Sequence, residues 1–110
     1  MRRYERQKVD MPVNVRITMD GISSTVKGHC VNLSQAGAGC IVAGRLRPGD
    51  FVLLEIAMPA QPEPMLVSAR VRHQERMYCG LEFVAPSYDV SDGIRRACVP
   101  PAVYYPRLHA

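Results

Sequence analysis

Residues 13–21 read Val-Asn-Val-Arg-Ile-Thr-Met-Asp-Gly, and this stretch decides the fold class. Val13, Val15 and Ile17 alternate with polar residues at a period of two, which is typical of a β-strand with one buried face. The Asp-Gly pair that follows is a favoured two-residue hairpin turn, because both of its positions tolerate a positive φ. The stretch therefore predicts a strand that turns back into a second strand.

The same period recurs along the chain and predicts five further strands. They cover residues 26–30, 40–42, 52–58, 67–73 and 77–83. In the fifth strand, Val67, Ala69, Val71 and His73 are expected to share one face. Turns are expected at residues 47–50 and 74–76, and the proline-rich segment 59–64 is expected to be a loop, because proline has no backbone donor for a central strand. Six short strands separated by turns predict an antiparallel barrel or sandwich.

The C-terminal quarter differs from the rest of the chain. Residues 90–98 are expected to form a short helix, with Asp89 or Ser91 as the N-cap and Arg95-Arg96 at its C-terminal end. The tail over residues 100–106 contains three prolines and is expected to be extended. It can pack against the barrel, remain mobile or dock a partner, and the sequence leaves these alternatives open.

Size and composition set the broad class. A chain of 110 residues with 47% hydrophobic and 22% charged residues has room for one globular domain with one core. No apolar run approaches the roughly 18 residues that cross a bilayer. The charged N-terminus lacks the apolar region of a signal peptide. A cytoplasmic location is therefore expected.

Cysteine and histidine spacing argues against a metal site. Cys30, Cys40, Cys79 and Cys98 form no C-x-x-C pair, and the three histidines are scattered. The thiols are expected to be reduced and mostly buried, with a Cys30–Cys40 disulfide as the alternative. Motifs for phosphate-binding loops, zinc proteases and serine hydrolases are absent from the sequence, so an enzyme is not expected.

The first segment that can carry chemistry is the basic N-terminus. The chain has a net charge of +4 and a pI near 9.1, and four of its first eight residues are basic. A guanidinium can grip a phosphate, or the O6/N7 edge of guanine, with two parallel hydrogen bonds. If the segment is extended, Arg2 and Arg6 lie on one face about 13 Å apart and Arg3 points to solvent; if it curls, Arg2 and Arg6 converge. The alternative is a solvated arm without a specific ligand.

The second segment is Asn32-Leu33-Ser34-Gln35-Ala36-Gly37. At a strand end, Asn32 and Ser34 are expected to share an exposed face while Leu33 turns into the core. Gly37 permits a positive φ, which would close a turn or let backbone approach a ligand. The alternative is a plain hairpin connection, because Asn and Ser favour turns.

Together the two segments read R-x-x-x-R before strand one and [D/N]-x-S-x-x-G between strands two and three, which resembles the PilZ domain family. Leu46–Asp50, the strand Val67–Arg72 and Cys79-Gly80-Leu81-Glu82-Phe83 extend the resemblance over residues 2–84. It implies an all-β fold, a six-stranded antiparallel β-barrel with a short C-terminal helix. The implied organisation is an arginine arm at 1–10, the barrel at 11–84, and the helix and tail at 85–110.

The resemblance implies a bacterial receptor for the second messenger cyclic di-GMP. The implied ligand-binding residues are Arg2, Arg3, Arg6, Asn32, Ser34 and Gly37, with no metal and no cofactor. The arginines would grip guanine edges and phosphates, Asn32 and Ser34 would contact a guanine, and Gly37 would let the base sit close. Ordering of the arm would transmit the signal to a downstream protein partner. The family often has Asp at the position of Asn32, and an amide presents one acceptor group where a carboxylate presents two.

Two other functions compete with a receptor. The first is an adaptor with the PilZ fold that acts through protein contacts and binds the nucleotide weakly or not at all. The second is a basic barrel that binds single-stranded nucleic acid, which usually requires exposed aromatic side chains for stacking. Phe51 and Phe83 are expected to pack inward and three of the five tyrosines lie near the termini, so binding of DNA or RNA is not expected.

Overall fold

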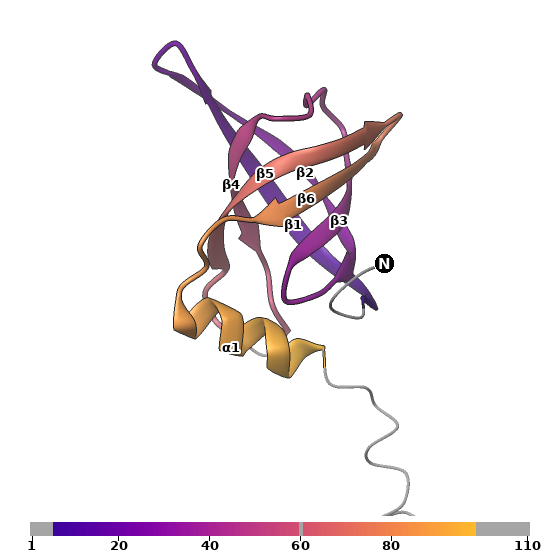
Figure 1. Cartoon of the computed structure of the whole chain (residues 1–110), viewed down its shortest axis with the longest axis vertical. Coiled ribbons are helices and arrows are strands. Elements are labelled where there is room, and N and C mark those ends of the chain that lie inside the picture. Colours follow the sequence, from indigo (N-terminus) through magenta and orange to yellow (C-terminus); the bar gives the residue numbers. More distant parts are fainter. Residues whose placement is uncertain (1–5, 60, 99–110) are drawn as a thin grey trace, which may run out of the picture.

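Six antiparallel strands close into a barrel in the computed structural model, which describes residues 6–59 and 61–98 (Figure 1). The strands of this described part are β1 (Gln7–Met19), β2 (Ile22–Leu33), β3 (Gly37–Val42), β4 (Phe51–Ile56), β5 (Met65–Glu75) and β6 (Tyr78–Phe83). Their order around the barrel is β1-β2-β3-β6-β5-β4, and pairing of β4 with β1 closes it. The expected six-stranded antiparallel barrel is confirmed.

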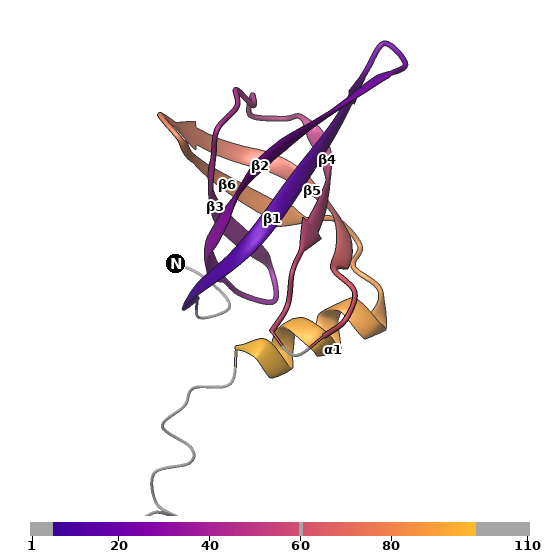
Figure 2. The same ribbon diagram turned by 180° about the vertical axis from the view of Figure 1, so that it is seen from behind.

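The β1–β2 hairpin is longer than the alternation predicted. Asp20 and Gly21 have φ values of 52° and 77°, as the Asp-Gly turn requires. Val13 and Val15 are buried, but Met19 is 59% exposed. The reason is visible in Figures 1 and 2, where the tip of this hairpin projects beyond the rest of the barrel. The apolar alternation thus identified the strand correctly, although the core ends before the strand does.

The barrel interior is filled by the inward side chains of all six strands. Three of them are the thiols of Cys30, Cys40 and Cys79, which lie in neighbouring register positions on β2, β3 and β6. All four cysteines are free, and Cys98 is partly buried. Burial raises the pKa of Cys79 to about 11. The cysteines act as small apolar residues of the core, as expected.

One helix, α1 (Tyr88–Ala97), lies across the end of the barrel opposite the projecting hairpin (Figure 1). Its N-cap is Ser87, whose hydroxyl accepts the Val90 N–H at 3.2 Å, so the expectation of Asp89 or Ser91 was wrong by two to four residues. Ile94 is completely buried in the barrel core. No helix within the described ranges is long and apolar enough to span a membrane.

Three side chains of the predicted strands lie on the surface, and a bulge accounts for the first of them. A bulge in β5 between Val71 and His73 turns His73 outward, where strict alternation places it inward. Met77 lies in the β5–β6 turn beside Arg76, whose φ is 55°, and is exposed. Phe51, expected in the core, is 55% exposed, and the Arg70 guanidinium lies 4.1 Å from its ring centroid. In the same strands Leu54 and Phe83 are buried as expected.

Candidate functional site

The structure brings together one residue from each of the two segments singled out in the sequence. Arg6 immediately precedes β1, and the β1–β2 register pairs Lys8 with Asn32. Arg6 Nη1 donates a hydrogen bond to Asn32 Oδ1 at 2.7 Å. Arg2 and Arg3, which the sequence placed in the same site, lie outside the described residues.

A bulge aims Asn32 at the outer surface. Cys30 and Leu33 are both fully buried although three positions separate them, which strict alternation does not allow. The β2–β3 register shifts between Cys30 and Asn32, so the strand gains one residue and Asn32 lies outside the core. Its amide faces Arg6 because of this bulge.

Tyr78 completes the group from the other side. Asn32 Nδ2 donates a hydrogen bond to the Tyr78 hydroxyl at 3.3 Å. Both side chains lie over Gly39 of β3, where an added Cβ would overlap the Tyr78 hydroxyl and the Asn32 amide. Arg6, Asn32 and Tyr78 therefore form a continuous row of hydrogen bonds that runs from the residue before β1 over β2 and β3 to β6. We call this row the Arg6–Asn32–Tyr78 row.

Ser34 is buried in the structure, which differs from the sequence interpretation. It was expected to share an exposed face with Asn32, but it is 3% exposed. Its hydroxyl accepts the N–H groups of Ala36 at 3.1 Å and Gly37 at 3.3 Å, and its own N–H donates to the Gly37 carbonyl at 2.9 Å. β2 ends at Leu33, so Ser34 no longer follows the alternation and instead holds the β2–β3 turn. This is the plain turn function that the sequence left open.

Gly37 is required for a different reason than the one expected. It lies at the start of β3 and does not have a positive φ. A Cβ at this position would overlap the backbone carbonyl of Leu81 on β6. The absence of a side chain lets β3 approach β6 closely, beside the surface depression described next.

A depression of about 350 Å³ opens beside the row. Its polar side chains are those of Arg6, Arg72, His73, Tyr78 and Glu82, and Glu82 is the one carboxylate among them. The His73 and Tyr78 rings are tilted by 56° with their centroids 6.2 Å apart, and Arg72 pairs with Glu82 at 3.0 Å. Glu82 offsets the charge of Arg72, so Arg6 and the row's polar atoms are the groups that suit an anionic ligand with hydrogen-bonding edges.

The sequence did not identify three of these residues. Arg72 and His73 both face the depression because the β5 bulge places two consecutive side chains outside. Tyr78 is 46 positions from Asn32 and carries no motif. Only the barrel closure through β3 and β6 brings it near, so no local signal could have revealed it.

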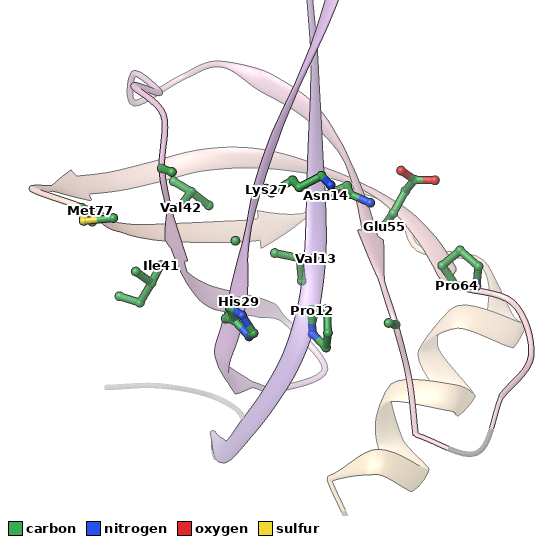
Figure 3. Close-up of a pocket in the computed structure, with 13 residues that line it drawn as sticks. Pro12, Val13, Asn14, Lys27, His29, Ile41, Val42, Glu55, Pro64 and Met77 are labelled. Atoms are coloured by element: carbon green, nitrogen blue, oxygen red, sulfur yellow. The ribbon is translucent and has the colours of Figure 1, made fainter.

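A second, larger depression of about 570 Å³ lies on the outer face of β1, β2 and β3 (Figure 3). Pro12, Ile41 and Met77 give it an apolar lining, with Lys27 and His29 among the polar side chains around it. It crosses Gly28, where an added Cβ would overlap the Ile41 carbonyl oxygen. No arginine lines it within residues 6–59 and 61–98, so it lacks the guanidinium groups of the first depression.

The closed barrel, the helix across one end and the basic depression define a small antiparallel β-barrel domain with a polar surface site. The chain belongs to the PilZ domain family, whose model matches residues 1–99. The resemblance inferred from the two motifs is confirmed. No curated protein sequence is similar enough to count as a match.

Solved structures with similar folds include several PilZ domains. The PilZ domain of CeSA from a cellulose-synthesizing bacterium is 18% identical with a TM-score of 0.66, covering 86% of this chain and 94% of that one. The PilZ domain of YcgR from Escherichia coli, solved with c-di-GMP, is 17% identical with a TM-score of 0.69 and 88% coverage of both chains. The Bacillus subtilis inhibitor of motility MotI/DgrA is 16% identical with a TM-score of 0.70, covering 89% of this chain and 49% of that one. At these identities the likeness shows a shared fold.

Proposed function

We propose that this protein is a bacterial, cytoplasmic receptor for cyclic di-GMP with no catalytic activity of its own. The observation that carries the proposal is the hydrogen bond between Arg6 and Asn32, which joins the two motif segments at the rim of a basic depression. The ligand seen in the YcgR PilZ domain supports this choice among anionic ligands.

The chemistry of the row matches such a ligand. Cyclic di-GMP offers two phosphodiesters and two guanines. The Arg6 guanidinium can leave Asn32 Oδ1 and form two parallel hydrogen bonds to a phosphate or to the O6/N7 edge of a guanine. Asn32 Oδ1 is then free to accept an N–H of a guanine, since amide oxygens accept and guanine N1 and N2 donate.

The remaining motif residues have separate roles in the proposal. Arg2 and Arg3 add cations from the arm, whose ordering costs conformational entropy that the charge-assisted hydrogen bonds offset. Ser34 acts through the turn it holds and makes no direct contact with the ligand. Gly37 lines the depression and leaves the place where β3 approaches β6 free of a side chain.

A path for the signal leads from the site to α1. Cys98, directly after α1, donates its thiol hydrogen to the carbonyl of Leu33 at 3.4 Å, and Cys30 donates to the carbonyl of Asn32 at 3.1 Å. The backbone beside Asn32 is thus in contact with the end of the helix. We propose that ligand binding changes the surface near this end, and that a downstream protein partner recognises the change.

Calorimetric titration of the full chain with cyclic di-GMP tests the proposal. Cyclic di-GMP is expected to bind. Cyclic di-AMP is expected to compete only weakly, because adenine lacks the O6 acceptor and the N1 and N2 donors of guanine. Absence of binding at high micromolar cyclic di-GMP would contradict the receptor function and favour the adaptor.

A further inference from the structure

A third depression, of about 720 Å³, is lined by the connection between β3 and β4 and by the β5–β6 turn. Both segments lie at the end of the barrel away from α1 (Figures 1 and 2). Arg45, Arg47 and Arg76 line it, and no acidic side chain of residues 6–59 and 61–98 does. We call it the arginine depression. It shares no lining residue with the depression beside the Arg6–Asn32–Tyr78 row.

The three guanidinium groups of the arginine depression are available to a partner. All three arginines are exposed, and none forms an ion pair in the part of the chain that the structure describes. The acidic residues next to them in the sequence have other contacts. Asp50 Oδ2 accepts the backbone N–H of Arg47 at 3.0 Å, and Glu75 lies 3.4 Å from His73 Nε2. The depression therefore offers three permanent positive charges that are not already paired.

The backbone that carries these arginines is held in place by the barrel. Leu46, which lies between the first two arginines, is 2% exposed and anchors the β3–β4 connection in the core. The Gly49 N–H donates to the Val71 carbonyl at 2.6 Å. Gln74 Nε2 donates to the Arg76 carbonyl at 2.7 Å. Because the backbone is already ordered, mainly the arginine side chains lose freedom on binding, which keeps the entropic cost small.

The arginine depression continues into the apolar depression of Figure 3. Val42, Ala43 and Met77 line both of them, and the Val42 N–H donates to the Met77 carbonyl at 2.9 Å. Met77 is 53% exposed at this junction. The one carboxylate of the apolar depression, that of Glu55, lies 3.8 Å from Arg16. Arginine and methionine are both enriched in protein interfaces, and a flexible thioether adapts to the side chains that it meets.

We propose that the two adjoining depressions bind a segment of a partner protein in which acidic residues are followed by apolar ones. The acidic residues complement the arginine depression, and the apolar residues cover Met77 and the depression beyond it. Single-stranded nucleic acid is disfavoured, because no Phe or Tyr among the described residues lines either depression for base stacking. A membrane is disfavoured because a flat surface does not enter two hollows. The proposal goes beyond the receptor function and does not depend on cyclic di-GMP.

NMR titration of the isotope-labelled full chain, without cyclic di-GMP, tests the proposal. The probe is a short synthetic peptide in which a run of glutamates is followed by leucines. Backbone amide shifts are expected to change at residues 43–47 and 74–77 and to stay constant at Asn32 and along α1. Added salt is expected to weaken the binding, because the contacts are exposed ion pairs. A peptide with lysine in place of glutamate is expected to cause no shift changes at these residues.

Two double variants with the same change of charge locate the contact. Arg45→Ser/Arg76→Ser is expected to raise the Kd of the peptide about fivefold, the effect of two exposed ion pairs. Arg95→Ser/Arg96→Ser removes two exposed arginines from α1, at the other end of the barrel, and is expected to change the Kd by less than about twofold. Met77→Ser is expected to weaken binding of this peptide but not of a peptide of glutamates alone.

Four results would overturn the proposal. The first is the absence of shift changes in the wild type at low salt, a measurement that needs no substitution. The second is a set of shift changes confined to the Arg6–Asn32–Tyr78 row. The third is equal weakening by the two double variants, because net charge would then control binding. The fourth is tighter binding of oligothymidylate, or of vesicles of phosphatidylserine and phosphatidylcholine, at residues 43–47 and 74–77, which would assign this surface to nucleic acid or to a membrane.

Discussion

Replacing Arg6 by alanine perturbs the contact that joins the two motif segments. In the free protein Arg6 makes one hydrogen bond to the neutral amide of Asn32 at 2.7 Å, worth about 1 kcal/mol. In the complex it is expected to make a bidentate, charge-assisted contact worth about 3 kcal/mol. Only the difference of about 2 kcal/mol favours binding, because the first contact is given up. Arg6→Ala is therefore expected to raise the Kd about 30-fold.

Calorimetry at moderate salt measures this change, and a second arginine provides the control. Arg16→Ala removes the same charge from β1, at a site where the guanidinium lies 3.8 Å from Glu55 in a long, partly exposed ion pair of little energetic value. Arg16→Ala is expected to bind like the wild type, and Arg6→Lys to fall between wild type and Arg6→Ala. Equal weakening by Arg6→Ala and Arg16→Ala would refute the reasoning, because net charge and not a specific contact would then control affinity.

Three further predictions concern the amide of Asn32, the close approach of β3 to β6 at Gly37, and the buried thiol of Cys79. Asn32→Asp is expected to tighten cyclic di-GMP binding by less than about fivefold by calorimetry. A carboxylate accepts two guanine N–H groups, but in the free protein it also makes a stronger contact with Arg6, which is given up on binding. Weaker binding than the wild type would show that the amide is preferred. Gly37→Ala is expected to lower the Tm by about 4–15 °C, because the added Cβ overlaps the Leu81 carbonyl. Gly80→Ala is the control and is expected to change the Tm little, because the nearest atom to a Cβ added at Gly80 is 3.4 Å away. Burial raises the pKa of Cys79 to about 11, so at pH 8 only about one thiol in a thousand is ionised in the native state. Iodoacetamide is therefore expected to modify Cys79 only after unfolding. Rapid labelling of Cys79 in the native protein would contradict its burial.

The cause of each sequence-based error lies in the local geometry. Alternation assigned the strands correctly, since burial on one face requires a period of two. It failed for His73 because a bulge adds one residue and reverses the face. It failed for Ser34 because the strand ends one residue earlier, at Leu33. The N-cap was misplaced because Ser87, Asp89 and Ser91 are all residue types that suit a cap, and the helix begins at Tyr88, directly after Ser87.

The sequence by itself determined the barrel, the family and the neighbourhood of the site, because these depend on periodicity, turn chemistry and residue order. Alternating apolar residues and the Asp20-Gly21 turn are local properties that any chain with this sequence carries. The tertiary structure alone decided which side chains meet. Closure of β3 onto β6 brings Tyr78 to an amide 46 positions away, and a bulge turns Asn32 toward Arg6. Such contacts arise from the register between distant strands, which no local pattern encodes.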